Sequence, residues 1–198
     1  REEFIRNFVQ CGIAFGEGVQ LWRDIAVVEA IIIDPDLVHE LESGMEAIFH
    51  QVDPELGDYF TIMRREGLLD LDNRHNKSPG GYQTDLRLVK RPFIFMNAVG
   101  QQRDIETLLH EAGHAFHNLL ARNEPVHAYR STTEEFCEVA SMAMELLTLP
   151  HARPFYPTDS EYARATRQQL LRTFTILPWI AQVDAFQQWI YTHPTHTQ

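Results

Sequence analysis

The segment from Ile105 to Arg122 constrains this chain most strongly, because its apolar residues recur with the spacing of one helix face. Side chains at i, i+3, i+4 and i+7 form a single stripe along a helix. The stripe consists of Ile105, Leu108, Leu109, Ala112, Phe116, Leu119 and Leu120. Asp104 is a favourable N-cap, and Asn123 and Pro125 follow the last turn. We therefore predict an amphipathic helix over this segment.

A His-Glu-x-x-His motif lies at the centre of this helix. His110 and His114 are four residues apart, so both imidazoles project from one face, nearly opposite the apolar stripe. Glu111 projects from the neighbouring edge of that face. On a helix, this motif is typical of zinc sites in which two imidazoles bind the metal and the carboxylate is the general base. The alternative is an amphipathic helix with two solvated histidines.

Gly113 stands between the two histidines, where a helix would gain from a residue with a side chain. Glycine inside a helix costs about 1 kcal/mol relative to alanine. Its presence at this position indicates that a substrate or another backbone approaches the helix closely.

A second helix is predicted to begin after Ser131-Thr132-Thr133 and to run to about Leu149. Its first carboxylates, Glu134 and Glu135, stand at capping-box spacing from Ser131 and Thr132, so a role at the helix start explains both. The carboxylates beyond the first turn need another explanation.

Glu138 is the predicted third zinc ligand. It lies 24 residues after His114 and shares a helix face with Ser141 and Glu145. A catalytic zinc site has three protein ligands and an open position. Cys137 falls away from the carboxylate face, and no third histidine follows the motif at the spacing of the other zinc class. Glu145 is a candidate partner for the second N–H of a zinc-binding histidine, with a solvated surface role as the alternative.

Two strands, residues 82–90 and 92–97, are predicted before the zinc helix, and the Asp- and Asn-containing segment from residue 68 is predicted to be loop. Pro92 suits an edge strand or a strand start. An exposed strand edge here could pair with an extended peptide, and Tyr82 is a candidate substrate-binding residue. The alternative is a hairpin that only covers the core.

Helices are predicted for most of the remaining chain. They cover residues 2–32, about 36–52, 54–66, 160–175 and 177–191, the last as a buried helix with two tryptophans. We expect one catalytic region, 1–198, comprising a helical scaffold at 1–67, a zinc-binding core at 68–149 and C-terminal helices at 150–198. Because the chain begins with Arg1, we expect it to be a fragment of a longer protein.

The composition is that of a soluble globular protein, with 44% hydrophobic and 23% charged residues. A net charge of −11 argues against nucleic acid or an anionic membrane as a partner. The two cysteines, Cys11 and Cys137, form no Cys-x-x-Cys pair, so neither a disulfide framework nor a thiolate zinc site is indicated. No apolar run approaches 18 residues. We expect a cytoplasmic protein.

The motifs HEAGHAFH and EVASMAMELL resemble the thimet oligopeptidase and oligoendopeptidase F family of zinc peptidases. The resemblance continues through NKSPGGY, PFIFMNAVGQQRDIETLL and VDAFQQWIYTHP. It implies that His110, His114 and Glu138 bind one Zn²⁺ per chain, with Glu111 as the catalytic base. It also implies a mainly α, zincin-type fold with a small antiparallel β-hairpin or sheet before the zinc helix. A deep channel in such a fold admits short peptides.

The chain departs from this family in one respect. Its members carry, nearer the C-terminus, a segment with histidine and tyrosines that hydrogen-bond the substrate, and no such segment is found before Gln198. We expect this chain alone to hydrolyse peptides poorly and to associate with a missing C-terminal portion or another copy. One alternative is a non-catalytic zinc-binding fragment. A deformylase-like hydrolase is disfavoured, because the cysteine ligand usual upstream of the motif is not evident.

Overall fold

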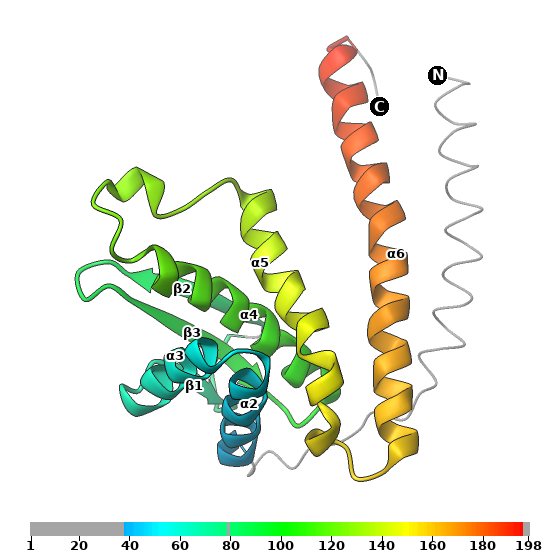
Figure 1. Cartoon of the computed structure of the whole chain (residues 1–198). Coiled ribbons are helices and arrows are strands. Elements are labelled where there is room, and N and C mark those ends of the chain that lie inside the picture. The colour runs from blue at the N-terminus through cyan, green and yellow to red at the C-terminus, as the bar shows by residue number, and fades with distance from the viewer. Residues whose placement is uncertain (1–37, 79, 196–198) are drawn as a thin grey trace. The chain divides into compact units, whose positions relative to one another are not determined.

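The computed structural model describes residues 38–78 and 80–195 (Figure 1), which divide into two compact units at Tyr162 and Ala163. The prediction of a helix over residues 2–32 lies outside these residues. Helices dominate the described chain, and one small sheet precedes the motif helix, so the predicted mainly α fold is confirmed. The larger unit holds the motif helix and is described first.

The helices predicted over residues 36–52 and 54–66 are α2 (Val38–Val52) and α3 (Pro54–Arg65), and together they form a hairpin. Asp53 caps α3, because its carboxylate accepts a hydrogen bond of 2.8 Å from the Glu55 N–H. Phe49 on α2 packs against Phe60 on α3 with 5.1 Å between ring centroids. Phe49 also makes an edge-to-face contact with Phe116 of the motif helix, with 4.8 Å between ring centroids. The hairpin therefore packs against the apolar stripe of that helix.

The sheet has three strands in the order β1-β3-β2. The central strand β3 (Arg91–Ala98) pairs antiparallel with β2 (Gly81–Leu86), as predicted, and parallel with β1 (Leu69–Asp72). The prediction of a loop over β1 is wrong. Leu71 is fully buried there, and the ammonium group of Lys77 donates hydrogen bonds to the carbonyl oxygens of Asp70 (3.0 Å) and Asp72 (2.6 Å).

The motif helix is α4 (Gln102–Ala121), and it packs against β2 and β3 on one side and α5 on the other (Figure 1). It begins earlier than predicted, because Asp104 is its third residue and not its N-cap. The Asp104 carboxylate accepts hydrogen bonds of 2.9 Å from the N–H groups of Val99 and Gln101. The carboxylate thus holds the turn between β3 and the helix in place.

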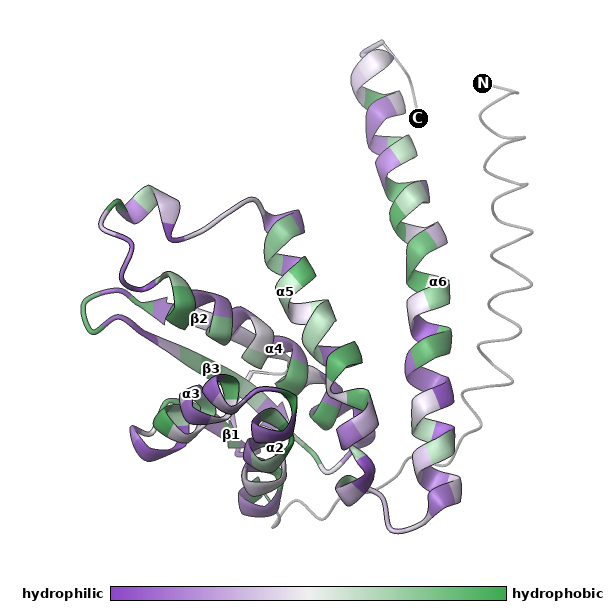
Figure 2. Ribbon diagram, viewed as in Figure 1, coloured by the Kyte–Doolittle hydropathy of each residue, from purple (hydrophilic) through white to green (hydrophobic). Residues whose placement is uncertain are grey.

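The second predicted helix is α5 (Glu134–Leu147), with Thr133 at its N-cap rather than Ser131 or Thr132. Its polar face is turned toward α4, and Ser141 and Glu145 are buried there. Hydrophobic residues occur along much of α5 (Figure 2), and four of them are exposed: Phe136, Val139, Leu146 and Leu147. This arrangement is the reverse of an ordinary surface helix and indicates that the one buried carboxylate, Glu145, has a specific task.

Within the described residues, the smaller unit contains most of α6 (Asp159–Thr192), a helix of 34 residues. Two helices were predicted here, with the second one buried. The helix instead continues through Pro178, and Leu177, Trp179 and Ile180 are each about half exposed. Among the helices between residues 38 and 195, none combines the length and apolar character that crossing a membrane requires.

Candidate metal centre

His110 and His114 project from the α4 face that is turned toward α5. Their rings meet edge to face, with 5.0 Å between centroids and an interplanar angle of 83°. Both side chains are partly buried, with 26% and 17% of their surface exposed. The i, i+4 spacing of the motif thus produces the paired imidazoles that the sequence predicts.

Glu138 on α5 completes a group of three candidate ligands. Its carboxylate oxygens lie 3.2 Å from Nε2 of His110 and 3.7 Å from Nε2 of His114. One donor atom from each of the three residues lies within 4.8 Å of the other two. Ser141 donates a hydrogen bond of 2.9 Å to the Glu138 carboxylate, which orients it toward the histidines.

The approach of α5 to α4 depends on Gly113. A Cβ atom at this position would lie 2.6 Å from Cα of Ser141 and 2.7 Å from the carbonyl oxygen of Ala140. Both neighbours are backbone atoms, so no side-chain rotation could relieve the overlap. The glycine between the two histidines is therefore explained by the packing of the helix that carries Glu138.

Glu145 binds the other nitrogen of His110, at 2.7 Å from Nδ1. This hydrogen bond is the largest cause of a raised pKa for His110, and burial of the ring opposes it. When Nδ1–H of the neutral ring donates to Glu145, the lone pair of Nε2 is free to bind a cation held jointly with Glu138. The pKa of His114 is lowered, chiefly because burial disfavours its charged form.

Glu111 is buried between α4 and the sheet, with 8% of its surface exposed. Burial raises the pKa of its carboxyl group, while nearby His110 and a hydrogen bond with the Gln83 backbone oppose the rise. A carboxylate whose pKa is raised in this way is better suited to accept a proton and release it again. Glu111 thus has the surroundings of a general base beside the three candidate ligands.

These residues fit a zinc ion. Two imidazole nitrogens and one carboxylate form a donor set found in catalytic zinc sites. The hydrogen bond from the Nδ1–H of His110 to the Glu145 carboxylate is the usual means of fixing the tautomer of a metal-binding histidine. The Glu138 carboxylate lies close to the ring nitrogens of both histidines, so a cation bound between them would contact all three residues. The net charge of −11 also favours binding of a cation.

Tyr82 lies on the opposite face of β2 from Gln83 and Asp85, whose side chains line a pocket next to His114. The Tyr82 ring stacks on Phe95, with 5.0 Å between centroids. Its role in substrate binding stays a prediction.

Two groups at the site, the hydroxyl of Ser141 and the backbone N–H of Gln83, were not predicted from the sequence. Ser141 stands three residues after Glu138, and side chains at this spacing are neighbours on a helix. The spacing could therefore have predicted their hydrogen bond. The backbone N–H of Gln83 had no such signal, because its contact with Glu111 depends on how the sheet packs on α4.

Comparison with known proteins yields one family and several similar structures. The model of peptidase family M3 matches residues 50–198. PZ peptidase A, solved with an inhibitor, is 34% identical with a TM-score of 0.70, and the match covers 77% of this chain. A protein from Bacillus anthracis str. Ames assigned as oligoendopeptidase F is 31% identical with a TM-score of 0.73, and 85% of this chain is covered.

The chain spans less than a third of the length of these structures, namely 27% of PZ peptidase A and 30% of the Bacillus anthracis protein. A search of curated proteins found no match.

Proposed function

Because the chain belongs to peptidase family M3, we propose that it forms the metal-binding and proton-transferring part of a zinc-dependent endopeptidase. The observation that carries this proposal is the group formed by His110, His114 and Glu138, with Glu111 buried beside it. In the proposed site, the two histidines bind one Zn²⁺ through Nε2 and Glu138 binds it through its carboxylate. When bound, the ion would polarise the scissile carbonyl group and lower the pKa of a coordinated water.

Glu111 is the proposed general base. Its carboxylate accepts a proton from the attacking water and later donates it to the amine that leaves when the peptide bond breaks. The raised pKa of Glu111 supports the second step, because a more basic carboxylate holds the proton long enough to transfer it. Glu145 keeps His110 in the tautomer that this site needs, and Ser141 orients Glu138.

The proposed substrates are short peptides, bound in an extended conformation along β2. This strand lies at an edge of the described sheet, so one side of its backbone is open to pairing with another strand. A peptide lying along this edge would pass Glu111, because the Gln83 backbone in the middle of β2 is hydrogen-bonded to that carboxylate.

A second candidate function is zinc binding without turnover. It is favoured by the small share of the similar structures that this chain spans, because groups that stabilise the tetrahedral intermediate could belong to the remainder. Loss of one such donor typically reduces kcat about 10²–10³-fold.

The Glu111→Gln variant tests the proposal, with Glu134→Gln as a control at the exposed start of α5. We expect Glu111→Gln to retain one zinc per chain and to lose at least about 100-fold in hydrolysis of a quenched fluorogenic peptide. The control should retain both properties. Metal loss or undiminished turnover in Glu111→Gln would contradict its role as the base. A wild-type chain that binds zinc and cleaves no peptide would favour the second function.

A further inference from the structure

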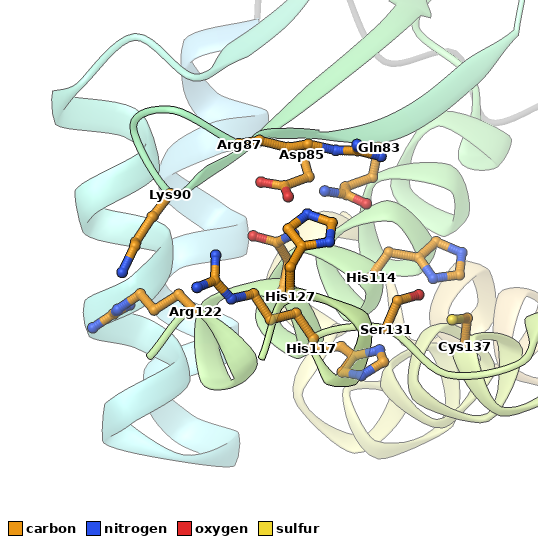
Figure 3. A pocket seen from close by; sticks show the side chains of 12 residues that line it. Gln83, Asp85, Arg87, Lys90, His114, His117, Arg122, His127, Ser131 and Cys137 are labelled. Carbon is orange, nitrogen blue, oxygen red and sulfur yellow. The ribbon is translucent and has the colours of Figure 1, made fainter. Parts of the chain in front are cut away.

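A pocket of about 210 Å³ adjoins the candidate metal centre. Its walls come from β2 and the turn after it, from the C-terminal half of α4, from the loop between α4 and α5, and from the first turn of α5. Figure 3 shows His114 and Cys137 at one end of this pocket and Lys90 and Arg122 at the other. A molecule bound at the metal centre could therefore extend into it.

The pocket lining is strongly basic. Four cationic side chains, Arg87, Lys90, Arg122 and Arg130, line it together with one carboxylate, Asp85. This local excess of positive charge occurs in a chain with a net charge of −11. Such a reversal in a concave site attracts a negatively charged ligand.

These four cations are not used in ion pairs within the described part of the chain, where no carboxylate lies within 4.0 Å of their nitrogen atoms. Arg130 donates a hydrogen bond of 2.7 Å to the carbonyl oxygen of Glu124, and Arg122 stacks 5.2 Å from the ring centroid of Tyr59. These contacts hold two of the guanidinium groups in place and leave their charge uncompensated. A salt-bridge network of the fold therefore does not explain the cluster.

We propose that this pocket binds a carboxylate group of the peptide substrate and so selects where the peptide is held. This inference rests on the proposed function and adds a substrate class to it. A volume of about 210 Å³ is smaller than the roughly 300–1,000 Å³ of sites for whole drug-sized ligands, which suits one side chain or one chain end. Arginine side chains match a carboxylate with two parallel hydrogen bonds.

Two sources of the carboxylate have this chemistry, an acidic side chain near the scissile bond and the free C-terminus of a short peptide. A polyanion such as nucleic acid fits poorly, because the net charge of −11 would repel its remaining phosphates. The position of the pocket next to His114 restricts the carboxylate to residues close to the bond that is cleaved.

The test measures peptide binding by fluorescence anisotropy with the zinc-loaded chain carrying Glu111→Gln, which prevents turnover. One set of labelled, amidated peptides carries a single Glu at successive positions, each paired with a Gln peptide. A second set differs only in a free or amidated C-terminus. We expect the peptide with the carboxylate to bind with a Kd about tenfold lower than its partner at low salt. This difference should appear in the first set if the carboxylate belongs to a side chain, and in the second set if it is the C-terminus.

Variants of the pocket residues test whether the pocket causes this preference for a carboxylate. Arg87→Gln with Lys90→Gln removes two cations whose side chains make no hydrogen bond or ion pair with the residues that the structure describes, and should reduce the preference to about twofold or less. Asp85→Asn removes a like charge and should increase it. Arg103→Gln, an exposed position on α4 outside the pocket, is the matched control and should leave it unchanged.

Equal affinity for every pair of peptides, or a preference unchanged in the Arg87 and Lys90 double variant, would overturn the assignment. Hydrolysis of the Gln peptides by the chain with Glu111 intact tests the proposed function separately. If that hydrolysis is absent, the binding preference still decides whether the pocket recognises a carboxylate.

Discussion

The carboxylate of Glu145 on α5 lies 2.7 Å from Nδ1 of His110 on α4, and this contact connects the two helices behind the candidate metal centre. Glu145 is buried, with 8% of its surface exposed, although it belongs to a helix whose apolar side chains face solvent. The helix therefore places two of its carboxylates, Glu138 and Glu145, against the histidines of the motif helix.

Replacing Glu145 by Ala should weaken zinc binding by about 10- to 100-fold, because the ring of His110 loses the acceptor that fixes its tautomer. The same change should lower the pKa of His110 in the metal-free chain, since Glu145 is the largest cause of its rise. Competition with a chelator measures the first effect, and an NMR titration of the imidazole measures the second. Unchanged zinc affinity would show that this hydrogen bond does not support the metal site.

The Gly113→Ala variant should be destabilised by about 1–3 kcal/mol and should bind zinc more weakly. Alanine favours the helix by about 1 kcal/mol, but its Cβ would overlap the backbone of α5 at Ser141 and push Glu138 away from the histidines. Urea unfolding and zinc titration measure the two effects.

Gly44→Ala is a suitable comparison for this variant, because the neighbour of Gly44 is the side chain of Phe155, which can rotate. This variant should leave zinc binding unchanged. Normal zinc affinity in Gly113→Ala would contradict the packing explanation for that glycine.

Acid should weaken the fold through Asp70, whose pKa is lowered from 3.8 to about 2, first because of its hydrogen bond with Arg74 and also through Lys77. The pKa is lower in the folded state, so this stabilisation is present above pH 4 and is lost as the pH falls toward 2. We expect a loss of about 1 kcal/mol, since Arg74 is half exposed. Wild type should lose more stability than Asp70→Asn between pH 5 and pH 2.5, measured by urea unfolding. Parallel losses in both proteins would contradict this assignment.

Local patterns predicted the parts of the site that depend on helix spacing. The apolar stripe and the i, i+4 histidines identified α4, and the position of Glu138 beyond the first turn of α5 singled it out from Glu134 and Glu135. The structure brings Glu138 to both histidines, as that reasoning expects. In these cases the period of a helix alone determines which side chains share a face.

Features that depend on tertiary packing were missed. The short segment β1 contains two aspartates and reads as a loop, and it becomes a strand through parallel pairing with β3 and the buried ammonium group of Lys77. The basic pocket collects residues from β2, α4 and a loop, so no single stretch of sequence reveals it. Two helices are predicted over residues 160–175 and 177–191, yet α6 runs without a break from Asp159 to Thr192.

Zinc content is the most direct test of the central claim that His110, His114 and Glu138 hold one metal ion. Elemental analysis should find one zinc per chain in the wild type and in Glu134→Ala, whose carboxylate lies at the start of α5. Glu138→Ala should lose most of its zinc after dialysis against a weak chelator, because one of three protein ligands is removed. Full zinc retention in Glu138→Ala, or loss in Glu134→Ala alone, would contradict the proposed metal centre.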